Sequence, residues 1–145
     1  MKIVFAGSSE FGIPALKKLK EKHQLLLIIS QPDRPAGRNQ RIKPCPIARF
    51  VREQGWELYQ PENINSPESV DKISKLYPEL LVTASYASLI KKELRQIPTF
   101  GAINLHPSLL PKYRGPTPIQ TALLNGEYKT GTTIFRLTSR LDAGP

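Results

Sequence analysis

Short apolar runs rich in Val, Ile and Leu alternate along the chain with segments whose apolar residues recur at helical spacing. The apolar runs predict buried strands at residues 2–6, 24–30, 80–84, 101–105 and 131–137, with a shorter strand at 56–59. The other segments predict helices at residues 10–22, 44–54, 66–77, 91–95 and 117–125. Because strands alternate with helices, we predict an α/β fold with a Rossmann-like, open, mostly parallel sheet and helices on both faces.

Two of these helices begin with recognisable capping residues. Ser66 and Pro67 have the residue types of an N-cap and a first helical position. Thr117 has the same capping potential, and Gln120 could reach back to complete a capping box. We therefore expect both helices to start at these points.

The turn after the first strand excludes one common ligand of this fold. Gly7 and Gly12 stand alone, so the glycine fingerprint of a dinucleotide site is absent. We therefore do not expect binding of NAD.

Residues 31–44 have no apolar period and contain repeated Pro and Gly, which predicts a loop. The segment places four cations, Arg34, Arg38, Arg41 and Lys43, against the single acidic residue Asp33. Such a loop either carries solvated charge or contacts phosphates, which arginine binds in bidentate fashion. The net charge of +9 over 145 residues favours a polyanionic partner such as nucleic acid.

Composition indicates one ordinary globular domain, with 39% hydrophobic and 23% charged residues. No apolar run approaches the length of a membrane helix, and the chain opens with a predicted strand instead of a signal peptide. The single cysteine, Cys45, excludes a disulfide framework and a cysteine-based zinc site within the chain. We expect a cytoplasmic protein.

Residues 100–116 carry the clearest candidate chemistry. Asn104 and His106 are two residues apart at the end of a predicted strand, so their side chains should leave the same face. Pro107 keeps His106 extended and forces the chain out of the sheet, at the edge where α/β proteins bind ligands. Asn could donate to a developing oxyanion and His could transfer a proton, although the pair could also serve only the local structure.

The run from Asn104 to Gly115, Asn-Leu-His-Pro-Ser-Leu-Leu-Pro-Lys-Tyr-Arg-Gly, resembles the signature of the formyltransferases that use 10-formyltetrahydrofolate. The run Leu141-Asp142-Ala143-Gly144 is similar to another catalytic motif of that family, although such an aspartate is also a common turn former. The resemblance implies the formyltransferase fold, Asn104, His106 and Asp142 as catalytic residues, and Asp142 as the group that fixes the tautomer of His106. It also implies a reaction that needs no metal. It also implies a folate site lined by Ser108, Leu109, Leu110, Pro111, Tyr86 and Leu89, with Ala87 where a glycine is usual.

The basic segment bears on the acceptor. It resembles the tRNA-facing insertion of the family members that formylate methionyl-tRNA, which implies initiator tRNA as partner and Arg34, Arg38, Arg41 and Lys43 as tRNA-binding residues. A sugar-nucleotide amine, glycinamide ribonucleotide and a non-enzymatic role in binding RNA or nucleotides remain as alternatives. By the same resemblance, we expect residues 1–145 to be an incomplete catalytic domain of a monomer, without the C-terminal β-barrel of the parent protein.

Overall fold

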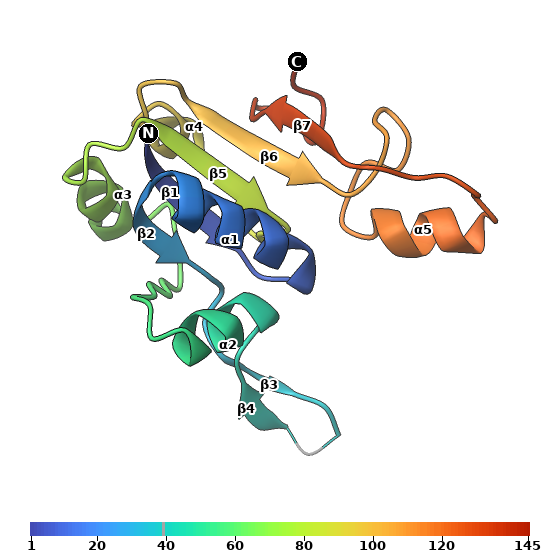
Figure 1. Ribbon diagram of the computed structural model, residues 1–145, viewed down its shortest axis with the longest axis horizontal. Helices are drawn as coiled ribbons and strands as arrows, with labels where there is room; N and C mark the ends of the chain where they lie inside the picture. Colours follow the sequence, from blue (N-terminus) through green and yellow to red (C-terminus); the bar gives the residue numbers. More distant parts are fainter. Residues whose placement is uncertain (39) are drawn as a thin grey trace.

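The computed structural model describes residues 1–38 and 40–145 (Figure 1). Its elements in chain order are β1 (Lys2–Gly7), η1 (Glu10–Gly12), α1 (Ile13–Lys22), β2 (Gln24–Ile29), β3 (Arg34–Ala36), β4 (Arg41–Lys43), α2 (Pro46–Glu53), α3 (Pro67–Ser74), β5 (Leu80–Ala84), α4 (Lys92–Arg95), β6 (Ala102–His106), α5 (Pro118–Leu124) and β7 (Thr133–Arg136). None of the helices in this part of the chain is long and apolar enough to cross a membrane.

The main sheet has the strand order β2-β1-β5-β6-β7. Its first four strands are parallel, and β7 pairs antiparallel with β6. The predicted α/β fold with a mostly parallel sheet is therefore confirmed. Because β1, β5 and β6 run in the same direction, their carboxyl ends meet at one edge, where the polar residues of β6 lie.

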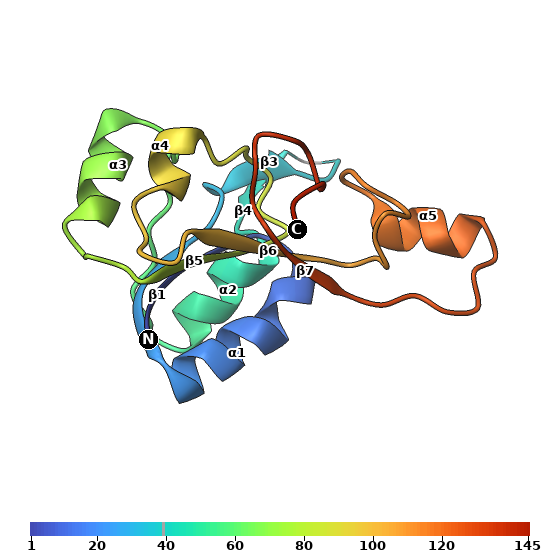
Figure 2. The same cartoon turned by 90° about the horizontal axis from the view of Figure 1, so that it is seen from above.

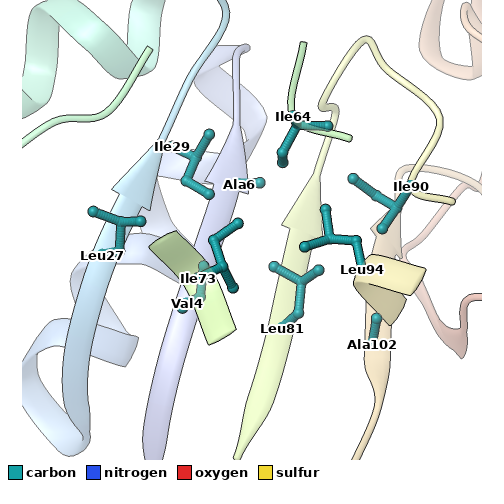
Figure 3. Packing of buried hydrophobic residues seen from close by; sticks show 10 residues of the cluster. All are labelled: Val4, Ala6, Leu27, Ile29, Ile64, Ile73, Leu81, Ile90, Leu94 and Ala102. Atoms are coloured by element: carbon teal, nitrogen blue, oxygen red, sulfur yellow. The ribbon is translucent and has the colours of Figure 1, made fainter. Parts of the chain in front are cut away.

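Helices cover both faces of this sheet, with α1 and α2 on one side and α3 and α4 on the other (Figure 2). Leu16, Ile47 and Val51 pack from α1 and α2 against one face. Ile73 and Leu94 pack from α3 and α4 against the other face, together with buried strand residues (Figure 3). Continuous apolar strands are expected where a parallel sheet is buried on both faces.

The structure departs from the sequence predictions in three places. Residues 31–44 include a short antiparallel hairpin, β3–β4, where a loop was predicted, and this hairpin projects away from the sheet (Figure 1). The strand predicted at 56–59 is reduced to a single bridge between Tyr59 and Ile29. Ser66 caps α3 by accepting a hydrogen bond from the Ser69 N–H, but the Thr117 side chain makes no capping bond to α5.

Candidate active site

A pocket of about 490 Å³ lies at the carboxyl edge of β5 and β6. The chain reaches it from four separate regions: the exit from β5, the end of β6, residues 115–118 at the start of α5, and the segment after β7. Its lining includes the three predicted catalytic residues, Asn104, His106 and Asp142. The structure therefore brings the three residues together around one pocket, and their roles remain predictions.

Asn104 has a defined orientation in the structure. Thr83 is its register partner on β5, and the Thr83 hydroxyl donates to Asn104 Oδ1 at 2.7 Å. With its oxygen engaged in this way, the carboxamide retains its NH₂ group for other partners. Asn104 is thus suited to donate a hydrogen bond within the pocket.

His106 is buried at the end of β6, with 4% of its surface exposed. Its Nε2 atom lies 2.8 Å from the backbone oxygen of Tyr113. A carbonyl oxygen only accepts, so Nε2 carries a proton, and in the neutral ring Nδ1 keeps a lone pair. The Tyr113 carbonyl therefore selects the tautomer, a role that the sequence assigned to Asp142.

Asp142 meets the other side of the imidazole ring. Its Oδ2 atom lies 3.8 Å from His106 Nδ1, and only 10% of its side chain is exposed. The same oxygen accepts a hydrogen bond of 2.8 Å from the Gly115 N–H, which fixes the carboxylate beside the loop formed by residues 107–116. Asp142 therefore places its carboxylate beside the imidazole ring of His106.

The residues predicted to bind folate fall into two groups. Tyr86 and Leu89 line the pocket, whereas Ser108, Leu109, Leu110 and Pro111 are outside the lining found over residues 1–38 and 40–145. Ser108 is buried, and its hydroxyl donates to the Lys112 oxygen at 2.7 Å. The Thr133 hydroxyl donates to the Ser108 oxygen and accepts from the Leu110 N–H. These hydrogen bonds hold the segment 108–111 in a fixed loop beside the pocket.

Tyr86 forms part of the apolar wall. Burial is the main cause that raises the pKa of its phenol to about 12. The ring therefore stays neutral and can donate a hydrogen bond at any physiological pH.

The basic hairpin is anchored at its base by a polar network. Arg52 donates to Asp33 Oδ2 at 2.8 Å and to Gln60 Oε1 at 2.7 Å, and Gln60 donates in turn to the Gln31 backbone oxygen at 2.8 Å. The hydrogen bond from Arg52 holds the pKa of Asp33 below its usual value. At the other end of this network, the Gln31 amide donates to Ser88 Oγ at 2.9 Å, and Ser88 lines the pocket. The hairpin is thereby linked to the pocket rim.

The four predicted tRNA-binding residues all lie exposed on this hairpin, but they differ in their surroundings. Arg34 forms an ion pair of 2.5 Å with Glu62. Within the described part of the chain, Arg38, Arg41 and Lys43 are in no ion pair. These three cations are therefore the better placed to bind phosphates.

Sequence analysis missed Thr83 and the main-chain groups of Tyr113 and Gly115. Thr83 did leave a signal, because it is the single hydroxyl residue in the apolar run of β5. Tyr113 and Gly115 act through their backbone, so their side-chain identities carry no comparable signal. Their contacts depend on how residues 107–116 fold back over the strand end.

A protein family described as "Formyl transferase" matches residues 1–145. The chain is 44% identical to methionyl-tRNA formyltransferases of Thermus thermophilus, over 145 residues, and of Macrococcus caseolyticus, over 143 residues. These alignments cover 100% and 99% of this chain but 48% and 46% of the relatives, so the chain spans about half their length.

Among solved structures, a phosphoribosylglycinamide formyltransferase from Bacillus halodurans superposes with a TM-score of 0.75. That alignment covers 100% of this chain and 76% of the other, at 21% sequence identity. At such low identity the likeness concerns the fold alone.

Proposed function

The chain belongs to the formyl transferase family, and from this premise we propose that the protein transfers a formyl group from 10-formyltetrahydrofolate to the α-amine of methionyl-tRNA. One arrangement carries the proposal. Asn104, His106 and Asp142 surround one pocket, and the Gln31–Ser88 hydrogen bond joins a basic hairpin to the rim of that pocket. A small-molecule donor and a polyanionic acceptor could therefore meet at the same edge of the sheet.

The pocket suits a small-molecule donor. Its volume of about 490 Å³ is within the range of about 300–1,000 Å³ that is typical of such sites. Apolar surface from Tyr86 and Leu89 is combined with the polar groups of Asn104 and His106. This combination fits a folate whose ring needs an apolar wall and whose formyl group needs hydrogen-bond donors.

In the reaction, the acceptor nitrogen bonds to the formyl carbon, the bond from that carbon to folate N10 breaks, and one proton moves from the amine to N10. Asn104 donates to the formyl oxygen as negative charge develops on it. His106 accepts the amine proton at Nδ1, because its Nε2 proton is committed to the Tyr113 carbonyl. Asp142 then stabilises the imidazolium across 3.8 Å.

The basic hairpin and the relatives favour tRNA as the acceptor carrier. The cations Arg38, Arg41 and Lys43 match a phosphate backbone, which gives affinity without reading sequence. The relatives that are 44% identical along the chain are named methionyl-tRNA formyltransferases. Glycinamide ribonucleotide is supported only by a likeness in fold, and an amino-sugar nucleotide would make no use of an extended basic hairpin.

The proposal is tested by supplying the full-length protein with 10-formyltetrahydrofolate and one of three acceptors: methionyl-tRNA, glycinamide ribonucleotide or an amino-sugar nucleotide. We expect formylmethionyl-tRNA to form at a rate at least about a hundred-fold above that of either small acceptor, the discrimination expected when a site uses specific contacts. Uncharged tRNA is the matched control, because it offers the same phosphates without the amine. Preference for a small acceptor would overturn the assignment, and binding of tRNA without any formyl transfer would favour the non-enzymatic alternative.

A further inference from the structure

We propose that Thr83 is a positioning residue that orients the carboxamide of Asn104 for the formyl transfer proposed above, on which this inference rests. Thr83 lies in β5 with 3% of its surface exposed, directly opposite Asn104 in the parallel register of β5 and β6. Its hydroxyl donates to Asn104 Oδ1 at 2.7 Å. Neighbouring positions on paired strands point to the same face, so the two side chains meet beside the pocket that Thr83 also lines.

The direction of this hydrogen bond decides what Asn104 offers to a substrate. A carboxamide carries an acceptor oxygen and a donor NH₂ group on opposite sides of its terminal carbon. When the hydroxyl of Thr83 holds the oxygen, the NH₂ group is the part that can face the formyl oxygen. Catalysis by Asn104 requires this orientation, because only a donor stabilises negative charge.

The opposite orientation is the competing arrangement. Thr83 Oγ1 also lies 3.2 Å from the Ile103 carbonyl, so its hydrogen could point there. Asn104 would then turn over, donate its NH₂ group to Thr83 and present its oxygen to the pocket. The shorter contact of 2.7 Å favours donation to Asn104, and the reversed amide would repel a developing oxyanion.

The surroundings of Thr83 also single out its hydroxyl. The other residues of β5 are Leu80, Leu81, Val82 and Ala84, and they face the core on both sides. Valine would fill the same volume at this position without a polar atom. A buried hydroxyl costs free energy unless it forms hydrogen bonds, so its presence here is explained by the partner that it holds.

Steady-state kinetics of the full-length protein with methionyl-tRNA test the role. Thr83→Val should lower kcat by about ten- to a hundred-fold, the usual effect of losing a residue that orients a catalytic group. KM should change by less than about two-fold. Thr83→Ser keeps the hydroxyl and should restore kcat to within about three-fold. In an Asn104→Ala background, Thr83→Val should cause no further loss, because Thr83 acts through the group already removed.

Thr121→Val is the matched control, since it removes a hydroxyl that donates to the backbone oxygen of Thr117, the residue before α5. Thermal unfolding of each variant separates a loss of orientation from a loss of fold. An unchanged kcat in Thr83→Val would overturn the proposal, as would a loss of equal size in the Asn104→Ala background. If Thr83→Val unfolds, a low kcat in folded Thr83→Ser would overturn it as well.

Neutron diffraction from crystals of the wild-type protein tests the orientation without any acceptor. Deuterons on the side of the Asn104 amide that faces away from Thr83 are expected. Amide deuterons of Asn104 directed at Thr83 Oγ1 would overturn the inference and leave the proposed function standing. Failure of the wild-type protein to formylate methionyl-tRNA would instead overturn the proposed function, and the neutron result would still decide the orientation.

Discussion

Replacing Arg41 with alanine should make the binding of methionyl-tRNA less sensitive to salt. Arg41 is exposed on β4, and over residues 1–38 and 40–145 it is in no ion pair. Each phosphate contact releases counter-ions, so the logarithm of affinity falls by about 0.9 for each tenfold rise in salt per contact. Between about 50 and about 200 mM salt, one contact accounts for a fall in affinity of about 3.5-fold. The affinity of Arg41→Ala should therefore fall about 3.5-fold less than that of the wild-type protein over this range.

Two other variants of the hairpin region act as internal comparisons. Arg34 is already paired with Glu62 at 2.5 Å, and both side chains are exposed, so Arg34→Ala should change the salt dependence less than Arg41→Ala does. Glu62→Gln should have the opposite effect, because it releases Arg34 to meet a phosphate. Lys75→Ala removes a cation that follows α3 and pairs with Asp71, and it should leave the salt dependence of binding unchanged.

The assay is equilibrium binding of methionyl-tRNA to the full-length protein, by filter retention over a range of potassium chloride concentrations. The slope of log affinity against log salt should be smaller for Arg41→Ala than for Lys75→Ala, which should match the wild-type protein. Equal slopes for Arg41→Ala and Lys75→Ala would refute the assignment of the hairpin as a phosphate-binding surface. A larger effect from Arg34→Ala than from Arg41→Ala would refute the argument from ion pairing.

Three further predictions concern the surroundings of the pocket. Gly144→Ala should lower kcat by about a hundred-fold, because a Cβ there would lie 1.7 Å from the Arg136 backbone oxygen and push the segment of Asp142 away; kinetics and thermal unfolding check this. The wild-type protein should lose stability as the pH rises from about 10 to about 12, because the phenol of Tyr86 ionises in the unfolded chain before it does in the folded one, and Tyr86→Phe should remove this loss. Urea unfolding across this range should show that the free energy of unfolding falls on the order of 2 kcal/mol further in the wild-type protein than in the variant. Arg52→Ala should raise the pKa of Asp33 toward its usual value and raise KM for methionyl-tRNA more than it lowers kcat, as measured by NMR titration and kinetics.

The sheet and the position of the pocket were predictable because they depend on strong local patterns. Apolar runs such as Leu80–Ala84 specify buried strands whatever surrounds them. Asn104 and His106 then follow from the two-residue repeat of a strand and from Pro107, which ends the strand. These signals are local in sequence, so a single chain contains them.

The parts that were missed depend on contacts between distant segments. Strands β3 and β4 have three residues each, with Pro35 and exposed cations, and they carry no apolar alternation. The tautomer of His106 is set by a main-chain oxygen, and the pairing of Thr83 with Asn104 is set by strand register. Hydrogen bonds to Thr133 hold the loop 108–111 beside the pocket, and the folate-binding role that the resemblance implies for this loop stays a prediction.

In the proposed mechanism, Asn104 stabilises negative charge on the formyl oxygen, and the hairpin binds tRNA independently of this role. A single-turnover experiment separates the two roles, with full-length protein in excess over methionyl-tRNA and saturating 10-formyltetrahydrofolate. Asn104→Ala should slow formyl transfer by about a hundred- to a thousand-fold, the usual cost of one lost oxyanion donor, and leave the dissociation constant for methionyl-tRNA within about two-fold of wild type. A transfer rate close to that of the wild-type protein would contradict the account.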